Sequence, residues 1–320
     1  MMRAIGTLFI ILAHVRAPAL LLTIRSFDVV MLVFISGMSF SIHHEFQYRR
    51  YLWKRVRKLV LPMWILMTVV FIFAGAAHWL LHWKMLYSPS QILSSYLFLS
   101  GGMGYVWIVR IYLLIAVVSP VLFRLASGIK KNGIFGLVVT AVALAAWFAN
   151  LLNRTLDSVF LEDYIVSGLA YSAVALCGMR FAVRLDFRNV FLVSALLLFA
   201  ICQLWICING SGFCVNDHKF PPSVYYISYG VLCSAVFYKI LPNRRIKAVE
   251  WISRHSYDVY LYHIVVLMAI SVLATTANMQ WVHEWFLLEY LLVLLLSVAL
   301  AFFHDQLKQA WGKKRRSANG

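Results

Sequence analysis

The segment RAIGTLFIILAHV, residues 3–15, is apolar enough to lie in a membrane, yet it begins with Arg3 and carries His14 near its end. In a helix, the eleven steps from Arg3 to His14 return to within about 20° of the same face, roughly 16 Å further along the axis. Arg3, Thr7, Ile10 and His14 therefore share one stripe. Ionisable side chains are costly in hydrocarbon, so this stripe needs a physical reason.

The composition of the whole chain indicates an integral membrane protein. Of its 320 residues, 62% are hydrophobic and only 13% are charged, and the mean hydropathy is +0.80. The formal net charge of +17 does not indicate a nucleic-acid-binding protein, because no soluble domain presents a basic patch among exposed aromatic side chains. The five cysteines are odd in number and lack metal-ligand spacing. They predict neither a disulfide framework nor a metal site.

Apolar stretches of about 20 residues predict an all-α bundle of ten membrane-spanning helices in a single domain, residues 1–320. The predicted spans lie near residues 4–22, 27–43, 59–79, 104–123, 133–150, 164–183, 190–209, 223–241, 256–275 and 285–304. A short basic tail, residues 305–320, follows the last span.

The positive charges alternate along this series of spans. With a cytoplasmic N-terminus, 23 of the 29 lysines and arginines fall on the cytoplasmic side, and six fall on the other. The cytoplasmic set comprises Arg3 and the groups Arg49–Lys58, Arg124–Lys131, Arg180–Arg188, Lys239–Arg254 and Lys308–Arg316. The positive-inside rule therefore places both termini in the cytoplasm.

His14 has several interpretations. It is either a functional group, a neutral core histidine bonded to a neighbouring helix, or a residue near the outer water if the first helix ends close to Pro18. Asp28 opens the second span, where the helix dipole alone explains a carboxylate. Straight helices would leave His14 about 12 Å from Asp28 along the membrane normal. An early end of the first helix would shorten that gap.

Other polar side chains interrupt later spans. Arg110 either reaches outward to the interface or holds an anionic or carbonyl group inside the bundle. In HSYDVYLYH, residues 255–263, Ser256, Tyr260 and His263 fall on one helical face. They form either a structural hydrogen-bond cluster or part of a site. Glu289, near the outer end of the last span, is interpreted as an interfacial residue.

The stretch QYRRYLWKRVRKLVLP, residues 47–62, carries six positive side chains just before the third span. Anionic lipid headgroups, or membrane orientation alone, would favour such a run. A cytosolic ligand with several phosphates would bind the same side chains. Composition does not separate these alternatives.

In order along the chain, these segments resemble the membrane-bound acyltransferase family 3. The resemblance rests on Arg3 and His14, on FDVVMLVFISGMSF at 27–40, on the basic element KRVRKLVLP at 54–62, and on GYVWIVRIYLL, DHKFPPSVYYISYG and HSYDVYLYH further on. Lys58 stands where the family element has a second arginine, and Arg110 stands where an apolar residue is expected.

This resemblance implies an O-acetyltransferase of the bacterial cytoplasmic membrane. Its donor would be acyl-CoA, most simply acetyl-CoA, bound from the cytoplasmic side, and its acceptor a hydroxyl of a surface glycan or glycolipid. We expect Arg55, Arg57 and Lys58 to hold the phosphates of CoA, with Arg3 at the cytoplasmic mouth of the path. The expected partners are thus acyl-CoA, the acceptor and membrane lipids.

His14 is the candidate catalytic base or transient acyl carrier, since burial favours the neutral imidazole that either role needs. Arg110, Tyr260 or His263 would donate to the oxyanion, and Asp28 would orient His14. A transporter is the main alternative and should show helices broken near the midplane or an internal repeat. A lipid-binding scaffold gives no reason for a histidine in the stripe with Arg3.

Overall fold

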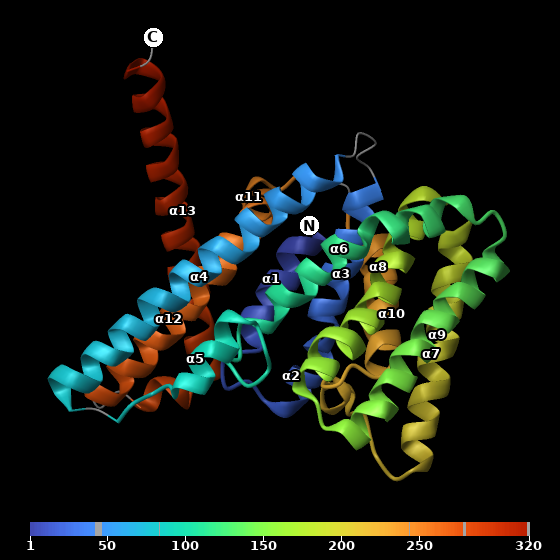
Figure 1. Cartoon of the computed structure of the whole chain (residues 1–320), viewed down its shortest axis with the longest axis horizontal. Helices are drawn as coiled ribbons and strands as arrows, with labels where there is room; N and C mark the ends of the chain where they lie inside the picture. Colours follow the sequence, from blue (N-terminus) through green and yellow to red (C-terminus); the bar gives the residue numbers. More distant parts are fainter. Residues whose placement is uncertain (42–46, 83, 243, 278–279, 319–320) are drawn as a thin grey trace. The chain divides into compact units, whose positions relative to one another are not determined.

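The computed structural model describes residues 1–41, 47–82, 84–242, 244–277 and 280–318. In that part of the chain every regular element is a helix, which confirms the predicted all-α class (Figure 1). The contacts group the chain into two compact units. The terminal unit combines Met1–Asp28 with Ile240–Gly320, and the central unit is Val29–Lys239.

The terminal unit joins the two ends of the chain. Its elements are α1 (Met2–Leu12), α2 (Ala19–Ile24), η1 (Arg25–Phe27), α11 (Lys247–Arg254), α12 (Ser256–Thr276), η4 (Gln280–His283) and α13 (Phe286–Ala318). Helices α12 and α13 pack side by side, and α1 contacts α11, α12 and α13 (Figure 1). The buried residues of α1 include Ala4, Thr7, Ile10 and Ile11, so the predicted stripe faces protein.

The central unit packs around α8. Its elements are α3 (Asp28–Ser41), which starts at the boundary, α4 (Tyr48–Leu81), α5 (Pro89–Tyr96), α6 (Trp107–Gly128), α7 (Asn132–Leu156), the π-helical turn η2 (Leu161–Val166), α8 (Ser167–Val183), α9 (Phe187–Ile208), η3 (Val215–His218) and α10 (Val224–Ile240). Two glycines let α3 and α8 approach closely. A Cβ on Gly37 would collide with the Ala175 carbonyl, and one on Gly178 with the Phe34 carbonyl.

Eight helices in the described ranges are long and apolar enough to cross a membrane, whereas the sequence predicts ten. The other two apolar helices are α1, with 11 residues, and α10, with 17. The predicted span 4–22 is wrong as a single helix, because α1 ends at Leu12 and α2 begins only at Ala19. Pro18 prevents one continuous helix through this segment, because it lacks a backbone N–H and disfavours helical geometry at the residue before it.

Two helices run beyond the predicted spans. Helix α4 has 34 residues and is about 51 Å long, well above a hydrocarbon core of about 30 Å. The basic stretch that precedes the predicted third span is therefore the first part of this helix. Helix α13 likewise continues through the predicted tail to Ala318.

Candidate functional site

His14 lies in the turn that follows α1, and its side chain is half-buried. Its imidazole centroid is 5.2 Å from that of His263 on α12, and the two ring planes are inclined by 33°. His263 is fully buried. The fold thus brings together two candidate residues that lie far apart in the sequence.

The surroundings of His263 fix its orientation. Its Nδ1 is hydrogen-bonded to the backbone carbonyl of Tyr260, and the Tyr260 ring centroid lies 5.0 Å from its own. A neutral imidazole that donates from Nδ1 keeps Nε2 as an acceptor. Tyr260 is also buried. Tyr260, His263 and His14 therefore form one contiguous row of predicted site residues within the terminal unit.

A buried carboxylate on α13 holds the turn that carries His14. Glu289 Oε2 accepts a hydrogen bond from the backbone N–H of Arg16, with 3.4 Å between the heavy atoms. Its Oε1 lies 2.8 Å from Nδ1 of His283. Glu289 and His283 are only 3% and 8% exposed. Because Arg16 is two residues beyond His14, the Glu289 carboxylate restrains the position of the histidine. Sequence reasoning treated Glu289 as interfacial and missed this contact.

Asp28 is completely buried at the start of α3. Its carboxylate lies 2.8 Å from Nη1 of Arg25, so the charge has a partner within the same short segment. The rings of Phe9 and Phe27, 5.1 Å apart, hold η1 against α1. This ring contact places Phe27, the residue before Asp28, against α1.

Arg3 lies in the first turn of α1 and is half-buried. Its carbonyl accepts a hydrogen bond of 3.0 Å from the Thr7 hydroxyl. Arg3, Thr7 and Ile10 follow the helix as predicted, whereas His14 lies past its last residue. The stripe therefore ends in a turn and not in the middle of a span.

The basic side chains of α4 do not share one face. Arg55 and Lys58 are three residues apart and therefore neighbours on the helix. Arg57 is two residues from Arg55, which places it about 160° away around the axis. The Arg55 guanidinium lies 5.2 Å from the Tyr51 ring centroid, and that of Arg57 lies 5.7 Å from the Trp53 ring. Arg55 and Lys58 therefore project from neighbouring parts of the helix surface, and Arg57 projects from another.

Arg110 lies in the central unit as half of a buried ion pair. Its Nη2 is 2.6 Å from Oδ1 of Asp163, and Nη1 donates to the Phe98 carbonyl. The other Asp163 oxygen accepts from the backbone N–H of Ser100 at 2.7 Å. The pair therefore fastens the loop after α5 to α6 and η2. Asp163, an acidic residue at the start of an apolar span, was the sequence signal for this partner and was missed.

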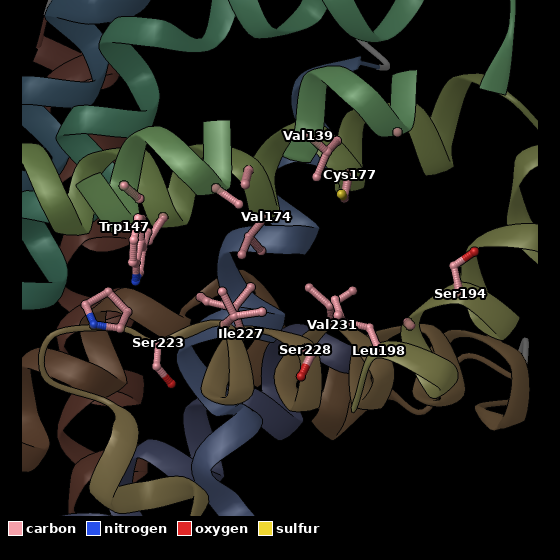
Figure 2. Close-up of a pocket in the computed structure, with 18 of the residues that line it drawn as sticks. Val139, Trp147, Val174, Cys177, Ser194, Leu198, Ser223, Ile227, Ser228 and Val231 are labelled. Atoms are coloured by element: carbon pink, nitrogen blue, oxygen red, sulfur yellow. The ribbon is translucent and has the colours of Figure 1, made fainter. Parts of the chain in front are cut away.

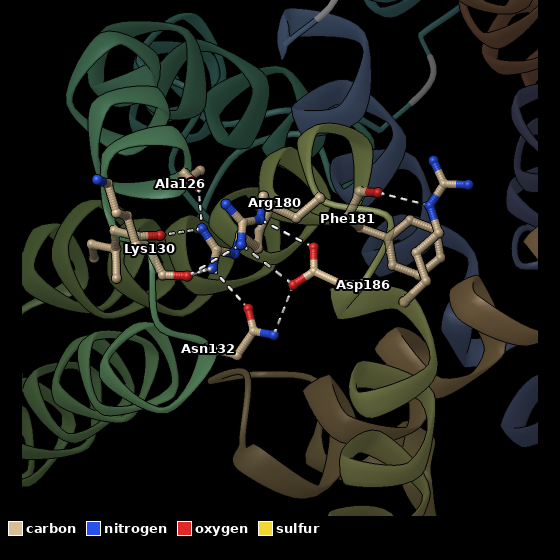
Figure 3. A network of polar contacts seen from close by, with 9 residues as sticks. Ala126, Lys130, Asn132, Arg180, Phe181 and Asp186 are labelled. Carbon is tan, nitrogen blue, oxygen red and sulfur yellow. Dashed lines mark hydrogen bonds and ion pairs between the residues drawn. The ribbon is translucent and has the colours of Figure 1, made fainter.

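A second buried arginine joins two turns of the central unit (Figure 3). Arg180 is fully buried and donates to the Ala126 carbonyl at 2.9 Å and to Oδ1 of Asn132 at 2.7 Å. Asn132 in turn donates to Asp186 at 3.3 Å. The hydrogen bond from Arg184 lowers the pKa of the Asp186 carboxyl. These contacts satisfy carbonyls at the end of α6, so Arg180 serves the fold.

Comparison with known proteins gives one positive finding. The family model of the acyltransferase 3 family, described as an acyltransferase domain, matches residues 1–305. Neither a curated protein nor a solved structure matches the chain. The match covers nearly the whole sequence, including the turn of His14 and its contacts on α12 and α13, and it agrees with the many membrane-spanning helices. The chain therefore belongs to the acyltransferase 3 family and is a membrane-bound acyltransferase.

Proposed function

We propose that this acyltransferase moves an acyl group, most simply acetyl, from acyl-CoA to a hydroxyl of a glycan or glycolipid at the cell surface, with His14 as the catalytic base. The observation that carries the proposal is the contact between His14 and His263, in a turn restrained by Glu289. A half-buried histidine with buried polar support is suited to proton transfer, because its orientation is fixed while one side stays accessible.

The chemistry needs one base and one anion-stabilising donor. A neutral His14 removes the proton of the acceptor hydroxyl as the oxygen attacks the thioester carbonyl. The C–S bond then breaks, and the thiolate of CoA takes the proton from the imidazolium. In the two-step variant, the His14 nitrogen attacks the thioester carbonyl, the C–S bond breaks, and the departing CoA thiolate takes the imidazolium proton, which leaves an acyl-imidazole. The acceptor oxygen then attacks the acyl carbon, the C–N bond breaks, and the imidazole takes the hydroxyl proton.

His263 and Tyr260 are the candidates for supporting this step, because both are buried beside the His14 turn within one unit. His263 orients the His14 ring, and the tyrosine hydroxyl is the candidate donor to the oxyanion. Asp28 remains a candidate for orienting the turn, although Arg25 already balances its charge. Arg110 is committed to Asp163 and the Phe98 carbonyl, so we assign it to the loop and not to the reacting carbonyl.

The donor phosphates are assigned to the first part of α4. Arg55 and Lys58 form a neighbouring pair of cations there, and Arg57 projects from another side of the same helix. CoA carries several phosphate charges, which arginine and lysine bind through charge-assisted hydrogen bonds. We assign a bidentate phosphate contact to Arg55, because its guanidinium group is planar, whereas the ammonium group of Lys58 is not. Arg3 is proposed to contact the donor from α1.

Transfer is tested with membranes from the source organism, which contain the natural acceptor. A strain lacking the gene, and the same strain carrying it, are compared after incubation of the membranes with carboxyl-labelled acetyl-CoA. The proposal predicts label in the glycan fraction that mild base releases as acetate, only when the protein is present. Equal labelling in both strains, or label that enters vesicles without bond formation, would contradict it. The latter result is the one expected of a transporter.

A further inference from the structure

A long cavity lies among α7, α8, α9 and α10 of the central unit, with a volume of about 620 Å³ (Figure 2). One face of α7 lines it from Asn132 to Arg154, about 33 Å along the helix axis. This length is close to that of a hydrocarbon core, about 30 Å. In Figure 2, Val174 of α8 and Ile227 of α10 project into the space from facing walls. The cavity is therefore a slot that follows the membrane-spanning direction of α7.

The middle of the slot suits a hydrocarbon chain. Small residues of α7, including Gly136 and Ala143, leave the space open, and Val139 and Ile227 give it apolar walls. Of the serines that also line the slot, Ser228 already donates its hydroxyl to the Tyr225 carbonyl. The walls therefore offer few of the polar partners that hold water in a cavity. The volume lies within the range of ligand pockets, about 300–1,000 Å³. A chain from the surrounding bilayer is the occupant whose chemistry matches these walls.

The two ends of the slot differ in charge. At one end Asn132 is already engaged by Arg180 and Asp186. At the other, Asn150 and Arg154 are four residues apart on the same face of α7. Within the described part of the chain, neither of these two side chains has a hydrogen bond or an ion pair. An arginine fork beside an amide is a suitable donor set for a phosphate.

We propose that the slot is a binding site for an anionic membrane phospholipid, with one acyl chain along α7 and the phosphate at Arg154 and Asn150. The unpaired positive charge of Arg154 favours a lipid with a net negative headgroup over a zwitterionic one. This site is independent of the proposed acyl transfer, because none of its lining residues takes part in that chemistry.

Native mass spectrometry of the full-length protein, stripped of lipid in detergent, tests the proposal. Phosphatidylglycerol and phosphatidylcholine with identical chains are titrated separately. We expect one phosphatidylglycerol to bind about tenfold more tightly than phosphatidylcholine. Arg154→Gln should abolish that preference, and Arg124→Gln, which removes an exposed charge away from the slot, should retain it.

The chain-binding part is tested with a second matched pair. Ala143→Phe places a ring in the slot and should prevent binding of either lipid, whereas Ala145→Phe faces away from it and should not. An unchanged preference in Arg154→Gln would overturn the headgroup assignment. Unchanged binding in Ala143→Phe would overturn the slot as the site. A lipid other than a phospholipid that co-purifies with the wild type before stripping, and is absent from Ala143→Phe, would overturn the assigned occupant.

Discussion

The imidazole rings of His14 and His263 are in contact, with their centroids 5.2 Å apart. One ring belongs to a turn near the N-terminus and the other to α12. Their contact joins two of the segments on which the family resemblance rests, and it gives a physical reason for a histidine after an apolar helix. The fully buried His263 supports the half-buried His14.

Replacing His263 tests that support. In His263→Phe the ring shape is kept and both nitrogens are lost, so His14 is no longer oriented by a polar neighbour. We expect kcat for acetyl transfer to fall at least tenfold, with little change in KM for acetyl-CoA, because the donor phosphates bind elsewhere. His304→Phe, at a histidine whose ring packs against Tyr262, is the matched control and should retain activity. A folded His263→Phe with normal kcat would remove His263 from the mechanism.

Glu289 is expected to act through the turn and not on the substrate. Glu289→Leu removes the acceptor for Arg16 N–H and leaves His283 unpaired, so kcat should fall about tenfold or more while KM changes little. Glu289→Gln keeps a carbonyl acceptor for Arg16 and should recover much of the rate. Glu284→Leu, at an exposed carboxylate on the same segment, serves as the control. Equal kcat in wild type and a folded Glu289→Leu would show that the turn needs no such restraint.

The division of the basic side chains on α4 predicts unequal effects on donor binding. Arg55→Gln and Lys58→Gln should each raise KM for acetyl-CoA about tenfold, equivalent to roughly 1.4 kcal/mol. Arg57→Gln should have a smaller effect, since this residue lies on another side of the helix. Initial rates at low and moderate ionic strength measure the change, and added salt should weaken binding to the wild type. If KM for acetyl-CoA in all three variants equals the wild-type value, the assignment of the phosphates to α4 is contradicted.

The buried Arg110–Asp163 pair predicts a loss of stability and not a specific loss of chemistry. Arg110→Met alone should destabilise the protein by roughly 3–5 kcal/mol, because it leaves a buried carboxylate uncompensated. The double variant Arg110→Met with Asp163→Leu should be less destabilised than the sum of the single changes. Unfolding in a denaturing detergent series provides the four free energies. Full stability of Arg110→Met combined with loss of turnover would instead return Arg110 to the active site.

Much of the fold could be predicted from the sequence, because apolar length and charge are local properties. Long apolar runs identified most of the spans, and the contacts of His14, Tyr260 and His263 followed residues already suspected. The end of α1 at Leu12 was harder, since an apolar run such as residues 3–15 does not show where a helix stops. Pro18 signalled a break in the apolar run, but it does not mark Leu12 as the last residue of the helix.

The partners of the buried charges could not be predicted, because they depend on which helices meet. Glu289 with Arg16, and Arg110 with Asp163, join segments that are far apart in sequence. Each of these residues is a single ionisable group in an apolar context, which signals a partner without naming it. The different faces of Arg55 and Arg57 became clear only once the basic stretch proved to be helical.

The most direct test of His14 is chemical rescue in the labelled-membrane assay. Membranes carrying wild-type protein, His14→Ala or the control His78→Ala, at an exposed histidine of α4, receive labelled acetyl-CoA with and without added imidazole. We predict that His14→Ala lowers acetyl transfer by roughly 10²–10⁴-fold, the contribution of a positioned base, and that imidazole restores a measurable part of it. His78→Ala should be unaffected. Wild-type rates in His14→Ala at equal protein abundance would contradict the central claim.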